Sequence, residues 1–85
     1  MHNDAGLKGG QSIAVFGAGG AGTAIVLAAS LASAYPIIAI DINDFKLEKA
    51  KEFGATHMIN SLKEDPSKKI KEYVPEGVDA AVDTT

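Results

Sequence analysis

The chain has 85 residues, of which 46% are hydrophobic and 22% are charged, so it is expected to form one small globular domain or part of a larger one. It contains no cysteine, which excludes disulfides, thiolate-bound zinc, iron–sulfur ligation and cysteine nucleophiles. The net charge is −3 and every basic residue is a lysine; without arginine forks to bind phosphate or guanine, we expect no nucleic-acid partner.

Four short apolar runs alternate along the chain with three stretches of high helix propensity. Glycine, proline or acidic residues bound the apolar runs, which is typical of strands buried on both faces. Gly54 is expected to end the second helix in the left-handed conformation. After a turn at 7–10, strands are expected at 11–16, 37–40, 56–59 and 78–82, and helices at 23–34, 44–53 and 65–73.

This strict alternation predicts an α/β fold, a partial doubly wound parallel sheet with helices on both faces. The expected strand order is third, second, first, fourth. The fourth strand then lies at an edge of the sheet, and Asp79 and Asp83 guard only part of that edge with charge. We therefore expect self-association through this strand.

Three glycines, Gly17, Gly19 and Gly22, form a G-x-G-x-x-G motif between the first predicted strand and the first predicted helix. Gly17 permits a tight turn, Gly19 lets backbone amides approach a pyrophosphate, and Gly22 allows close packing of helix on strand. The start of the following helix supplies free amides and positive potential for an anion. In the alternative interpretation, the glycines serve only the turn between strand and helix.

Asp41 ends the second predicted strand, roughly 20 residues after the motif, where a carboxylate accepts hydrogen bonds from the hydroxyls of an adenosine ribose. The same charge repels a 2′-phosphate, so the pattern favours NAD over NADP. Asp41 could instead be only the polar end of a strand or a turn former.

Two other nucleotide motifs fit less well. A kinase-type phosphate loop fails because Gly22 and not lysine precedes Thr23, and a methyltransferase is disfavoured because Val15-Phe16 replace the usual acidic residue.

The segments SIAVFGAGGAG, IIAIDINDFKLEKAKEFGATHMIN and GVDAAVDTT resemble the cofactor domain of medium-chain dehydrogenases, most closely the zinc-dependent alcohol dehydrogenases. The resemblance covers residues 7–85. It implies that Asp41 binds the adenosine ribose with help from Lys46, while Gly19-Gly20 meet the pyrophosphate. Ala21 stands where valine is usual, and Ser33 where many members have glycine. The cofactor-binding residues are thus expected to be Gly17, Gly19, Gly20, Ala21, Gly22, Asp41 and Lys46, with no catalytic or metal-binding residue.

The resemblance implies that residues 1–85 are the N-terminal half of a dinucleotide-binding (Rossmann) domain. The parent protein would transfer hydride between NAD and an alcohol or aldehyde, with zinc held in a separate catalytic domain. The chain is interpreted as an excised or engineered segment, inactive alone, that binds the ADP part of the cofactor. A regulatory NAD-sensing module and a minimal folding unit without activity are the alternatives. No apolar run has the length of a membrane span and the start is polar, so we expect no membrane partner and a cytoplasmic location.

Overall fold

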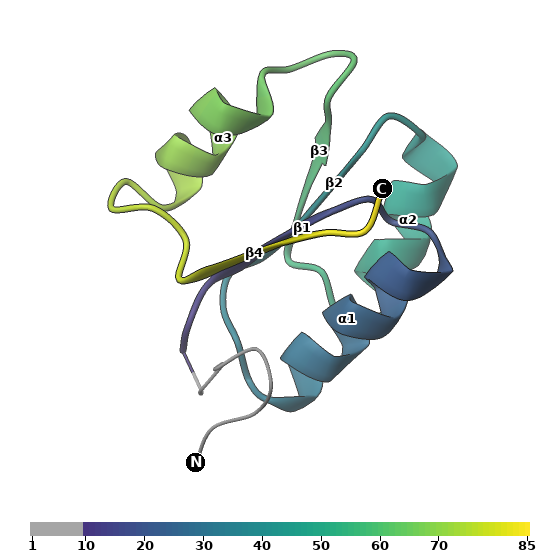
Figure 1. Cartoon of the computed structure of the whole chain (residues 1–85), viewed down its shortest axis with the longest axis horizontal. Helices are drawn as coiled ribbons and strands as arrows, with labels where there is room; N and C mark the ends of the chain where they lie inside the picture. The colour runs from purple at the N-terminus through teal and green to yellow at the C-terminus, as the bar shows by residue number, and fades with distance from the viewer. Residues whose placement is uncertain (1–9) are drawn as a thin grey trace.

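A computed structural model describes residues 10–85 as a central sheet with helices on both faces (Figure 1). Apart from Gly10, the turn expected at 7–10 lies outside the described residues. None of the helices within residues 10–85 combines the length and the apolar character that a membrane span requires. The elements in chain order are β1 (Ile13–Phe16), α1 (Gly20–Leu31), β2 (Ile37–Asp41), α2 (Asp44–Glu52), β3 (His57–Asn60), α3 (Pro66–Tyr73) and β4 (Ala80–Asp83).

The four strands are parallel and lie in the order β3-β2-β1-β4, which confirms the predicted topology. Helices α1 and α2 cover one face of the sheet, and α3 covers the other (Figure 1). Successive strand residues point to opposite faces, so Val15 joins the core under α1 and α2 while Ala14 and Ile38 join the core under α3. The central strands are thus buried on both faces, as their continuous apolar sequences predicted.

The predicted helix ends are confirmed for α2 and α3, where side chains cap the backbone. Asn43 accepts a hydrogen bond from the Lys46 amide at 3.1 Å, and Asp65 accepts one from the Ser67 amide at 3.0 Å. Gly54, just after α2, has a φ of 124°, and a Cβ there would lie 2.6 Å from Ser30 on α1. Glycine is therefore required both by the backbone conformation and by the contact between the two helices.

Four boundaries differ from the sequence-based expectation by two residues or more, and one of them is the end of α1, which lies at Leu31 instead of at residue 34. Helix α1 begins at Gly20, inside the glycine motif, instead of at residue 23, because packing against the preceding loop outweighs the low helix propensity of glycine. Strands β1 and β4 begin two residues later than expected. Ser12 and Asp79 precede these strands and bond to each other through backbone and side chain, with the Ser12 amide 2.8 Å from Asp79 Oδ2 and the Asp79 amide 2.9 Å from Ser12 Oγ.

Ser33, in the turn after α1, has a φ of 61°, a left-handed conformation in which a Cβ is strained. The side chain of Ser33 is exposed. The backbone cannot change to a negative φ without loss, because hydrogen bonds from the Gly10 amide to the Ser33 carbonyl and from the Ser33 amide to the Ser30 carbonyl hold the turn. Ser33→Gly is expected to raise the free energy of unfolding by about 0.5–1 kcal/mol. Ser33→Ala keeps the Cβ and should bring no gain. Denaturant unfolding of the three proteins tests this, and an equal gain from alanine would contradict the backbone explanation.

Candidate functional site

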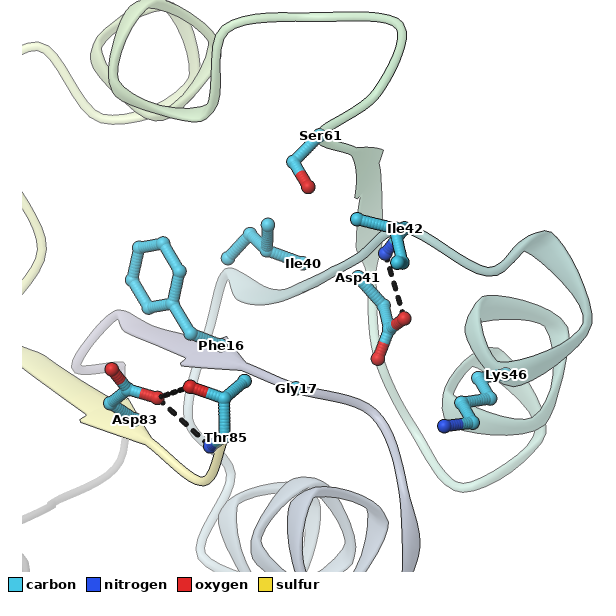
Figure 2. Close-up of a pocket in the computed structure, with 9 residues that line it drawn as sticks. All are labelled: Phe16, Gly17, Ile40, Asp41, Ile42, Lys46, Ser61, Asp83 and Thr85. Carbon is cyan, nitrogen blue, oxygen red and sulfur yellow. Dashed lines mark hydrogen bonds between the residues drawn. The ribbon is translucent and has the colours of Figure 1, made fainter.

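The carboxyl ends of β1, β2 and β4 meet at one edge of the sheet, where a cleft of about 380 Å³ opens (Figure 2). Helix α1 leaves β1 toward β2, whereas the chain later returns to the other side of β1 as β4. This reversal of strand order is the position where open α/β sheets bind ligands. The residues lining the cleft are Phe16, Gly17, Ile40, Asp41, Ile42, Lys46, Ser61, Asp83 and Thr85.

Two glycines of the motif are required by the fold itself. Gly17 has a φ of 97°, and a Cβ there would lie 2.5 Å from Thr84 Oγ1. At Gly22 a Cβ would overlap the carbonyl oxygen of Gly17, so the first turn of α1 lies directly against the end of β1. These contacts confirm the tight turn and the close packing of helix on strand that the motif predicted.

No contact within the protein requires glycine at the two central positions of the motif, Gly19 and Gly20. A Cβ at either position would meet no protein atom within 4 Å, and Gly19 has a φ of −76°, which any residue can adopt. No side chain caps α1, and its first helical hydrogen bond runs from the Thr23 amide to the Gly19 carbonyl at 2.8 Å. The amides of residues 20–22 therefore precede the helical hydrogen-bond ladder and are available to an anion.

Asp41 ties the glycine loop to the end of β2. Its Oδ2 accepts a hydrogen bond from the Ala18 amide at 2.7 Å. Its Oδ1 accepts from the amides of Ile42 at 2.7 Å and Asn43 at 3.0 Å. Asp41 is thus a turn former, as the alternative interpretation held, and it also fixes the loop before α1. A carboxylate has about four acceptor positions, so capacity for one further donor remains.

The surroundings of Asp41 keep its side chain ionised. Partial burial works to raise the pKa of this carboxyl group, but the hydrogen bonds from Ala18, Asn43 and Ile42, together with the positive charge of Lys46, lower it below its ordinary value of 3.8. The cleft therefore keeps a negative charge at its β2 side throughout the neutral range.

Lys46 lies in the first turn of α2 and lines two clefts. It borders the cleft at the strand ends, where Figure 2 shows it beside Asp41. It also borders a second hollow of about 300 Å³ near the start of α1. Its ammonium group can therefore bind an anion in either of these hollows. The second hollow is lined by Ala18, Gly19, Gly20, Thr23, Lys46, Lys49 and Phe53.

The structure brings most of the predicted site residues together. Gly17, Asp41 and Lys46 line the cleft at the strand ends, and Gly19 and Gly20 line the second hollow. The remaining two predicted residues line neither the cleft nor the second hollow: Gly22 is buried beneath the loop, and Ala21 is exposed on α1. Sequence reasoning missed several lining residues, although the rule that parallel strands end at one edge indicates those that follow a strand. The missed residues are Phe16, Ile40, Ile42, Ser61, Asp83 and Thr85 in the cleft at the strand ends, and Ala18, Thr23, Lys49 and Phe53 in the second hollow.

The fold and the glycine loop together define a partial Rossmann-like sheet. The model of the zinc-binding dehydrogenase family matches residues 20–85, and the chain belongs to that family. This confirms the resemblance to zinc-dependent alcohol dehydrogenases. Within residues 10–85, no three acidic or histidine side chains are grouped so that they could hold a metal ion.

Similar proteins include both dehydrogenases and a lyase. The chain is 41% identical to an aliphatic (R)-hydroxynitrile lyase of Linum usitatissimum over 88 residues, covering 96% of this chain and 21% of that protein. The structure of an alcohol dehydrogenase zinc-binding domain protein from Burkholderia ambifaria is 44% identical with a TM-score of 0.94, covering 98% of this chain and 22% of that one. The structure of benzyl alcohol dehydrogenase from Acinetobacter calcoaceticus is 42% identical with a TM-score of 0.93, and the match covers 98% of this chain and 23% of that one. The chain therefore spans about a fifth of the length of these relatives.

The lowered pKa of Asp41 predicts how its contribution to stability depends on pH. A carboxyl group whose pKa is lower in the folded than in the unfolded chain stabilises the fold above its unfolded pKa, and this contribution is lost as the pH falls through the folded pKa. Asp41→Asn should thus be destabilising by a constant amount above about pH 5, and the difference should shrink below about pH 4. Unfolding measured against pH, with an NMR titration of the Asp41 carboxyl, tests this. A titration midpoint at or above 3.8 would contradict the described hydrogen bonding.

Proposed function

We propose that this chain binds the adenosine and pyrophosphate side of NAD, as a segment of an oxidoreductase resembling zinc-type alcohol dehydrogenases. The observation that carries the proposal is the pair Gly19 and Gly20. Both are glycines in a place where neither the backbone nor a neighbouring protein atom requires glycine. A ligand that approaches the backbone closely at the start of α1 explains both positions.

The chemistry of the loop suits a pyrophosphate. The amides at the start of α1 have no helical acceptor, and the helix adds positive potential at the same end. Lys46 and Lys49 line the adjacent hollow and add two positive charges. Because the loop presents backbone donors and not long side chains, its geometry is fixed before the ligand arrives.

The chemistry of the cleft suits the adenosine ribose. Asp41 is held ionised and can accept a hydrogen bond from a ribose hydroxyl, while its charge opposes a 2′-phosphate. NAD is therefore the expected cofactor in preference to NADP. In the whole protein, NAD would supply the hydride acceptor, and these residues would bind and orient its adenosine end.

The reaction of the whole protein is proposed from its relatives. We propose hydride transfer between NAD and an alcohol or aldehyde, with zinc bound outside these residues, because benzyl alcohol dehydrogenase is among the similar structures. The 41% identical hydroxynitrile lyase supports a lyase as the second candidate. Both candidates assign the same nucleotide-binding role to this segment. An assay of the full-length protein with NAD and alcohols, beside one with a hydroxynitrile, separates them.

Binding of cofactor fragments tests the role of the central glycines. NAD, ADP-ribose and ADP should bind the chain with similar affinity, because all three carry the adenosine diphosphate that the site contacts. Nicotinamide mononucleotide should not bind measurably. Gly19→Ala should weaken ADP-ribose binding about 10- to 150-fold, because the added Cβ stands between the phosphate and the backbone donors. Calorimetry or NMR shift mapping measures this.

Stability measurements separate this effect from damage to the fold. Gly19→Ala should leave the free energy of unfolding unchanged or slightly higher, since its Cβ meets no protein atom. Ser33→Ala, at the far end of α1, is the matched control and should change neither the fold nor the affinity. If Gly19→Ala binds ADP-ribose as tightly as the unmodified chain, the pyrophosphate does not lie on this loop.

We also propose that the chain self-associates through β4. In the described structure, β4 pairs with β1 on one side only, and its exposed Ala81 leaves the middle of the other edge without charge. Light scattering should show a dimer or larger species whose fraction rises with concentration. Ala81→Lys should shift it to the monomer, whereas Ala28→Lys on α1 should not. A monomer at every concentration would contradict the proposal.

A further inference from the structure

Asn60, the last residue of β3, joins three segments at the rim of the cleft. Its side-chain oxygen accepts a hydrogen bond from the Leu62 amide at 2.9 Å. Its side-chain nitrogen donates to Asp44 Oδ1 at 2.8 Å and, more weakly, to the Ile42 carbonyl at 3.4 Å. One amide group thus connects the end of β2, the start of α2 and the loop that leads from β3 to α3.

The backbone of Asn60 lies at the same junction. Asn60 stands opposite Asp41 in the parallel register of β2 and β3, and the Ser61 amide continues this pairing with a 3.1 Å hydrogen bond to the Asp41 carbonyl. Ser61 and Ile42 follow directly, and both line the cleft, as Figure 2 shows. The spacing between these two side chains therefore depends on the group that holds their segments together.

Besides this backbone hydrogen bond, one ion pair of side chains also connects the loop after β3 to the start of α2. Lys63 forms an ion pair with Asp44 at 3.0 Å, but both side chains are about two-thirds exposed, at 68% and 64%. Such surface pairs contribute little and are screened by salt. The hydrogen bond from Asn60 is also the largest cause of the lowered pKa of Asp44. The Asn60 side chain links the loop to the start of α2 through two hydrogen bonds, one with the Leu62 amide and one with Asp44.

We propose that Asn60 is a positioning residue for the nucleoside end of the bound dinucleotide. The inference rests on the proposed function, because it assigns the nucleoside to the cleft between Ile42 and Ser61. An apolar side chain on one rim and a hydroxyl on the other can hold a base and its ribose only at a fixed separation. The Asn60 side chain holds this separation together with the backbone hydrogen bond between Ser61 and Asp41, and it does not line the cleft itself.

The test is the affinity for ADP-ribose, measured by calorimetry at a temperature where every variant is fully folded. Asn60→Ala should bind about 3- to 10-fold more weakly than the unmodified chain. Asn60→Asp should bind no better than Asn60→Ala, because two carboxylates would then face each other. Combining Asn60→Asp with Asp44→Asn restores a donor and an acceptor in the reverse direction, and affinity should return to within about 2-fold.

Ser12→Ala is the matched control. It removes a comparable side-chain link, that between β1 and β4, at the opposite end of the sheet from the cleft. It should leave the affinity for ADP-ribose unchanged in the folded protein. Unchanged affinity in Asn60→Ala, or failure of the exchanged pair to recover, would overturn the positioning role while leaving the proposed function standing. If the unmodified chain does not bind ADP-ribose, the proposed function falls first, and the positioning role falls with it.

Discussion

The close approach of α1 to the end of β1 is the constraint on which the site depends. Gly22 lies against the Gly17 carbonyl with no room for a Cβ. Because this contact falls in the first turn of the helix, it fixes where α1 begins and not merely how its axis lies on the sheet. The backbone donors of that turn are thereby held at the edge where β1, β2 and β4 end. A wider separation would move these donors away from the Asp41 side of the cleft.

The sequence predicted the strand order, the ends of α2 and α3 to within one residue, and the reasons for Gly17 and Gly22, because each follows from a local pattern. Apolar runs alternating with helices leave few topologies, and a glycine motif at a strand end has a restricted set of geometries. The predicted start of α1 was wrong because the low helix propensity of glycine argues against a helix at Gly20, whereas packing against the preceding loop stabilises a helix there.

What the sequence did not predict are links between side chains that the fold brings together. The Ser12–Asp79 link joins residues 67 positions apart, and the Asn60–Asp44 link joins residues 16 apart. Neither belongs to a short motif, and serine, asparagine and aspartate occur in any turn. Their partners become evident only when the strand register is known. The cleft residues Ser61 and Asp83 differ from these links, because the predicted topology already places them at one edge of the sheet although no short motif marks them.

The proposed contact of Asp41 with the ribose, together with its hydrogen bond to the glycine loop, bears on how such a site can change its cofactor. Replacing this acid with a small residue removes the charge that opposes a 2′-phosphate, and it also removes the acceptor for the Ala18 amide. That amide would then lack an acceptor in a partly buried loop, and the loop proposed to hold the pyrophosphate would become less ordered. In the proposed binding mode, cofactor preference and loop rigidity are therefore coupled through a single carboxylate. A variant selected for a phosphorylated ribose would need a second substitution that supplies the Ala18 amide with a new acceptor.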